Sequence, residues 1–77
     1  MPNLPSLKSQ EVIHALIKAG FYIQRQKGSH ARLFHSQRHD LKITVPVHNK
    51  DIPENTLKRI LKQAELAEQD FIKLINK

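Results

Sequence analysis

The sequence predicts an α+β domain in which a three-stranded antiparallel sheet carries its helices on one face. Three patterns lead to this expectation: a helical apolar repeat near the N-terminus, alternating segments separated by turns in the middle, and a second helical repeat towards the C-terminus. The 77 residues are enough for one domain, predicted to span residues 1–77. The expected order is α-β-β-β-α with a short C-terminal helix.

The first helix is predicted by apolar residues that recur at helical spacing between Val12 and Ile17. Ser9 precedes this repeat and is expected to cap the N-terminus. Gly20 follows it, where a residue with positive φ commonly ends a helix. Residues 9–20 therefore contain both the body of the helix and its two end signals.

Three strands are predicted between residues 21 and 45. Residues 21–27 and 30–35 are rich in strand-forming residues, and Gly28 and Ser29 supply the turn between them. Residues 41–45 alternate strictly, so one face of this strand should carry the three apolar side chains of Leu41, Ile43 and Val45. A hairpin followed by a third strand is expected.

The second helix is predicted to follow Pro53, a residue suited to the first turn of a helix. Its apolar side chains repeat at i, i+3, i+4 and i+7: Leu57, Ile60, Leu61 and Ala64. Residues 67–75 are expected to form a short third helix with one apolar side: Phe71, Leu74 and Ile75.

The sheet should have one face free of helices. Ala31 and Leu33 suit the helix-covered side of the second strand, so the intervening His30, Arg32 and Phe34 are expected on the open side. An aromatic ring such as Phe34 can stack with a nucleic-acid base, enter an interface, or fold over its own sheet.

The net charge of +6 is concentrated in the middle of the chain, where residues 25–50 contain six Lys or Arg and one acid, Asp40. A basic surface on a small domain is typical of nucleic-acid binding, because neutralising phosphates releases counterions. A solvated surface that serves solubility is the alternative. The chain contains no cysteine and no long apolar segment, which favours a cytoplasmic protein without a membrane span or a thiolate metal site.

Four segments of the sequence form a recognisable set: AGF at 19–21, RQKGSH at 25–30, ITVPVH at 43–48 and TLKRILKQAEL at 56–66. Together they resemble the HicA family of toxins, which are mRNA interferases of bacterial and archaeal toxin–antitoxin pairs. The resemblance extends from about Leu7 to Leu74. It implies a double-stranded-RNA-binding-domain-like fold, metal-free RNA cleavage and a HicB-type antitoxin as partner. It also implies that His30, in the GSH motif, is the catalytic residue.

Two departures from the family pattern are visible. The segment VPVHNKDIP after the third strand is shorter and lacks a glycine that members often carry, which affects the expected placement of His48. Glu65 stands where a glycine is usual after LKQA. This second departure concerns only the end of a helix.

RNA chemistry is consistent with these roles, since RNA supplies its own nucleophile in the 2′-hydroxyl and a histidine exchanges protons near neutral pH. His30 is expected to act as general base, and Lys27 and Arg32 to hold phosphate. Arg25, Gly28 and Ser29 complete the expected RNA-binding set. His48 is a candidate for the acid that protonates the leaving oxygen, with packing of its loop as the alternative.

Two other classes of function remain open: a non-catalytic double-stranded-RNA-binding module with the same fold and charge, and a protein-interaction domain whose open sheet is an interface. His35, His39 and Asp40 have an H-x3-H-D spacing, but a hairpin loop does not set their side chains on one helix face as a zinc site would need. We expect no metal and no cofactor. The expected partners are mRNA and a HicB-type antitoxin that covers the His30 face.

Overall fold

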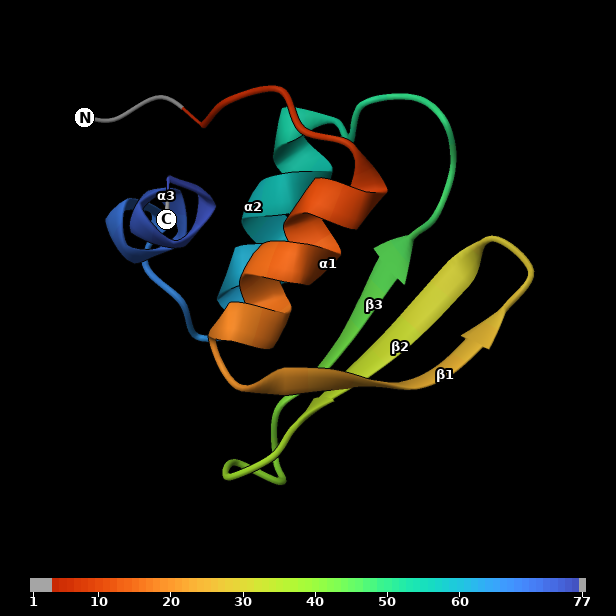
Figure 1. Cartoon of the computed structure of the whole chain (residues 1–77), viewed down its shortest axis with the longest axis vertical. Coiled ribbons are helices and arrows are strands. Elements are labelled where there is room, and N and C mark those ends of the chain that lie inside the picture. The colour runs from red at the N-terminus through yellow and green to blue at the C-terminus, as the bar shows by residue number, and fades with distance from the viewer. Residues whose placement is uncertain (1–3, 77) are drawn as a thin grey trace.

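The computed structural model describes residues 4–76, and it confirms the predicted α+β order (Figure 1). The predicted domain of residues 1–77 includes positions 1–3 and 77, which lie outside the described residues. The third strand begins and ends one residue later than expected, and the other elements match the expectation closely. The elements are α1 (Ser9–Lys18), β1 (Phe21–Lys27), β2 (His30–His35), β3 (Lys42–Pro46), α2 (Glu54–Gln63) and α3 (Glu68–Ile75).

The sheet has the order β1-β2-β3, with both pairs antiparallel. The helices lie to one side of it, where α1 contacts β1 and β3, α2 contacts β3, and α3 packs on α1 and α2 (Figure 1). One core forms between the helices and the sheet; its fully covered side chains include Val12, Leu16, Ala31, Leu33, Ile43, Val45, Leu57, Ile60 and Phe71. Burying these side chains on one side leaves the other sheet face open. Among residues 4–76, no helix is long and apolar enough to span a membrane.

The prediction that Ser9 caps α1 is wrong. Ser9 is the first helical residue and is only 1% exposed, and its hydroxyl donates to the Pro46 carbonyl at 2.7 Å. The same oxygen accepts the His48 backbone N–H at 3.3 Å. Lys8 takes the capping position, and its N–H donates to the Glu11 carboxylate at 3.1 Å. Burial against the exit of β3 therefore gives Ser9 a tertiary hydrogen bond in place of a local cap.

Two helix ends use a left-handed backbone conformation. Gly20 follows α1 with φ of +104°, as predicted, and a Cβ at this position would lie 2.8 Å from His35 Nε2. Glu65 follows α2 with φ of +54°, at the site where a glycine was expected from the family pattern. Only glycine adopts such values without a steric cost. The Glu65 carboxylate accepts a hydrogen bond from Arg38 at 3.2 Å, which ties this helix end to the loop after β2.

Opposite effects on stability are expected at these two positions. Gly20→Ala should lower the free energy of unfolding by about 2 kcal/mol, because the backbone becomes strained and His35 must move. Glu65→Gly should raise it by about 0.5 kcal/mol, because relief of the left-handed strain exceeds the combined cost of the added freedom of glycine in the unfolded chain and of the lost, exposed contact with Arg38. Urea unfolding measures both, and a loss of stability in Glu65→Gly, or no loss in Gly20→Ala, would contradict this account.

Candidate functional site

The open face of the sheet is organised by an irregularity in β1. Ile23 pairs with Leu33 and Arg25 pairs with Arg32, so Gln24 is an extra residue between two neighbouring pairs. This is a β-bulge, in which two residues of one strand oppose one residue of the other. Beyond the bulge the pairs are Gln26 with Ala31 and Lys27 with His30.

The bulge decides which way the basic side chains of β1 point. In a regular strand Arg25 and Lys27 would share the side of Phe21, which is buried against the helices. The extra residue reverses the alternation, so Arg25 and Lys27 emerge on the side opposite to the core, with their partners Arg32 and His30. Two cations are thereby added to the His30 face.

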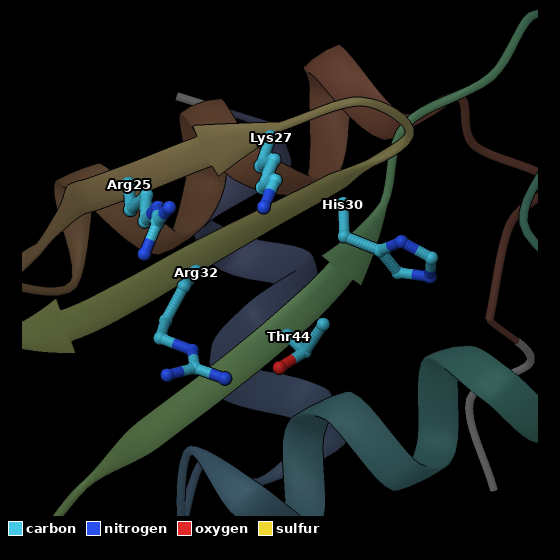
Figure 2. Close-up of a pocket in the computed structure, with 5 residues that line it drawn as sticks. All are labelled: Arg25, Lys27, His30, Arg32 and Thr44. Carbon is cyan, nitrogen blue, oxygen red and sulfur yellow. The ribbon is translucent and has the colours of Figure 1, made fainter.

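Five side chains from the three strands line a shallow hollow of about 180 Å³ on the open face. We call this hollow the basic pocket; it is lined by Arg25, Lys27, His30, Arg32 and Thr44. Figure 2 shows these side chains on one side of the sheet, with α1 behind it. All five residues are exposed, which leaves the pocket accessible to a large ligand.

The positive charge of the pocket is not neutralised within the described chain. Among residues 4–76, no acidic side chain forms an ion pair with Arg25, Lys27 or Arg32. The neighbouring Arg38 differs, because it donates to both carboxylate oxygens of Asp40, at 3.1 and 3.0 Å, and to Glu65.

These hydrogen bonds lower the pKa of Asp40 and raise the pKa of Arg38. Asp40 and Glu65 thus offset the charge of Arg38, whereas the charges of Arg25, Lys27 and Arg32 in the basic pocket stay available to a ligand.

The GSH motif forms the tip of the hairpin and the start of β2. Gly28 has φ of +58°, as a two-residue hairpin turn with glycine in its first position requires. The Ser29 carbonyl accepts the Val47 N–H at 2.6 Å, which holds the tip against the exit of β3. Gly28 and Ser29 do not line the basic pocket. The turn that they form places the following residue, His30, in the lining of the pocket. The Ser29 hydroxyl lies 3.5 Å from His30 Nδ1.

His48 is not brought into the basic pocket. It lies after β3 and lines a separate hollow with Lys8, Ser9 and Asn49. Its backbone N–H donates to the buried Ser9 hydroxyl, while its side chain is exposed. The two histidines therefore face different hollows of the molecule.

His35 has a structural role. Its Nδ1 accepts the backbone N–H groups of Gln37 and Arg38, at 3.0 and 2.9 Å, an arrangement that assigns the ring N–H to Nε2. Nε2 then donates to the Ala19 carbonyl at 3.1 Å, and the ring packs edge-on against Phe21. Both nitrogens are engaged with the backbone, so His35 has no lone pair to offer to a metal. Among the described residues no group of three or more His, Cys, Asp or Glu is arranged to hold a metal ion.

The parity argument for β2 is confirmed. Ala31 and Leu33 are fully buried, while His30 and Arg32 are exposed. Phe34 also lies on the open side but is half-buried, since it packs against Tyr22 with ring centroids 6.4 Å apart. Sequence reasoning missed Thr44 as a lining residue. The signal was present, because burial of the residues on either side of Thr44 turns its own side chain to the open face.

The arrangement offers one imidazole and three guanidinium or ammonium groups to a single ligand. Such a set can bind a phosphodiester through charge-assisted hydrogen bonds while the imidazole accepts a proton from a hydroxyl group beside the phosphate. The fold and the face together define a small domain of the double-stranded-RNA-binding-domain-like class with a cationic open sheet. 

A family model described as the HicA toxin of bacterial toxin–antitoxin systems matches residues 9–66. The chain belongs to this family, as the sequence motifs indicated. The matched segment runs from the start of α1 to just beyond α2 and contains the whole basic pocket. A comparison with curated proteins gave no match.

Proposed function

We propose that this toxin is an endoribonuclease that cleaves mRNA without a metal ion, with His30 as general base. The observation that carries the proposal is the position of His30 in one pocket with Arg25, Lys27 and Arg32, none of which is ion-paired among the described residues. When the 2′-hydroxyl of RNA is the nucleophile, an imidazole can accept its proton and cations can stabilise the charge on the phosphate. The proposed site of action is the cytoplasm, where mRNA is found.

In the proposed reaction His30 accepts the proton of the 2′-hydroxyl, and the 2′-oxygen forms a bond to the adjacent phosphorus. The bond from phosphorus to the 5′-oxygen breaks, and that oxygen takes a proton from water. The products are a 2′,3′-cyclic phosphate and a 5′-hydroxyl. Lys27 and Arg32 hold the phosphate and stabilise the negative charge that grows on its oxygens in the transition state.

Cleavage by the purified toxin should persist in EDTA and leave 2′,3′-cyclic phosphate ends, because the nucleophile comes from the RNA itself. His30→Ala should abolish cleavage and leave RNA affinity within about twofold, since the cations still bind the phosphate. Analysis of product ends and a binding titration on the same RNA provide both measurements.

A substrate with a single 2′-deoxy nucleotide is the matched control, because cleavage should stop only at that linkage. Cutting at the deoxy linkage, or a requirement for Mg²⁺, would argue against the mechanism. Wild-type binding without any cleavage would favour the non-catalytic RNA-binding module.

RNA affinity should fall steeply with salt, and the slope should report the phosphate contacts of the basic pocket. Lys27→Gln or Arg32→Gln should flatten the slope of log K against log salt by about one unit each. Arg38→Gln is the matched control, because the same charge is removed where Asp40 and Glu65 already offset it. Equal slopes in all three variants would exclude Lys27 and Arg32 from the binding site.

The proposed partner is a HicB-type antitoxin that covers the His30 face. The pocket lies on an open sheet, and the described chain has no segment folded over it. A stable cover must bury roughly 1,200–2,000 Å² in total. Its acidic side chains would meet Lys27 and Arg32 and so compete with RNA phosphates.

Antitoxin and RNA should therefore exclude each other. Adding antitoxin should protect the His30 imidazole from chemical modification. Increasing concentrations of RNA should displace the antitoxin from the toxin. Inhibition of cleavage while His30 stays fully reactive would show that the antitoxin acts elsewhere on the fold.

A further inference from the structure

The open sheet face carries a third row of side chains beyond the basic pocket. The pairing of the strands places residues in rows that cross β1, β2 and β3. The row nearest the hairpin tip is Lys27, His30 and Pro46; the next is Arg25, Arg32 and Thr44; the last is Tyr22, Phe34 and Lys42. The third row differs from the other two because it contains two aromatic rings.

The geometry of this aromatic row leaves one ring accessible. Tyr22 and Phe34 pack edge to face at 68°, and Lys42 Nζ lies 5.7 Å from the centre of the Phe34 ring. Phe34 is half-buried between these neighbours, whereas Tyr22 remains 47% exposed. Phe34, which Lys42 covers in turn, therefore limits the movement of a Tyr22 ring that still presents surface to solvent.

The aromatic row lies next to the residues of the basic pocket that would hold a phosphate. Phe34 is two residues from Arg32 along β2, which corresponds to about 7 Å, and Tyr22 is the partner of Phe34 in β1. A nucleic-acid strand with one phosphate at Arg25 and Arg32 would bring a neighbouring base close to the Tyr22 ring. Bases inside a duplex are stacked on each other and cannot reach such a ring, while an unpaired base can.

We infer that Tyr22, supported by Phe34 and Lys42, is a base-stacking subsite and that the substrate is RNA unpaired next to the phosphate held in the basic pocket. The inference rests on the proposed function for its RNA ligand, but not on cleavage. The neighbouring Arg25, Arg32 and Lys42 favour a polyanionic strand over an apolar protein segment as occupant. Stacking explains why an aromatic residue with half its surface open stands beside the cations.

Intrinsic fluorescence tests the subsite directly, because Tyr22 is the only tyrosine and the chain has no tryptophan. Binding of single-stranded RNA to the His30→Ala protein should quench this emission, and the corresponding duplex should quench it much less. Tyr22→Leu should weaken single-stranded binding by at least about fivefold, whereas Tyr22→Phe should retain the wild-type affinity. Ile23→Ala is the matched control, since Ile23 is 42% exposed on the same strand but faces the other side.

The results separate this inference from the proposed cleavage. If the wild-type protein fails to cut RNA while RNA quenches Tyr22 and Tyr22→Leu binds weakly, the subsite stands and the nuclease proposal fails. Saturating RNA that leaves the emission unchanged would overturn the subsite, even if cleavage occurs. Equal quenching by duplex RNA, or equal affinities of the Leu and Phe variants, would also overturn it.

Discussion

The β-bulge at Gln24 is the constraint on which the candidate site depends. The first half of β1 must turn Phe21 towards the core, and a regular strand would then carry Arg25 and Lys27 to the same side. On that side, β1 beyond Phe21 runs along the groove beside α1 that Ile23 and Gln26 line, so neither cation would lie on the face of His30. One inserted residue satisfies the core and delivers both cations to the face that holds His30.

The rest of the molecule is arranged around the two unequal faces of this sheet. Helices α1 and α2 cover one face of the sheet, and α3 packs on these two helices. The strand side chains buried on this side are Phe21, Ala31, Leu33, Ile43 and Val45. The other face receives basic side chains from β1 and β2 and an aromatic row at its far end. Two hydrogen bonds hold this face in a fixed position. One joins Val47, just after β3, to Ser29 at the hairpin tip, and the other joins Pro46, at the end of β3, to Ser9 in α1. Core and site are therefore built from alternate residues of the same strands.

Much of this arrangement follows from local pattern. The turn at Gly28 and the burial of Ala31 and Leu33 were sufficient to predict the hairpin and the open position of His30. The direction of Arg25 and Lys27 was not predictable from strict alternation, because a bulge has no reliable signal in this sequence. Ser9 shows the same limit, since a distant carbonyl at Pro46 outweighed the local capping preference.

The measurement that tests the central claim most directly is the RNA affinity of the charge-transposed variant Gln26→Lys/Lys27→Gln. It keeps the net charge of +6 but moves one cation to the neighbouring position, which pairs with Ala31 and lines the groove beside α1. If the bulge places Lys27 on the His30 face, this variant should bind RNA as weakly as Lys27→Gln alone. An affinity equal to or above that of the wild-type protein would mean that β1 alternates regularly and that the basic pocket is not assembled as described.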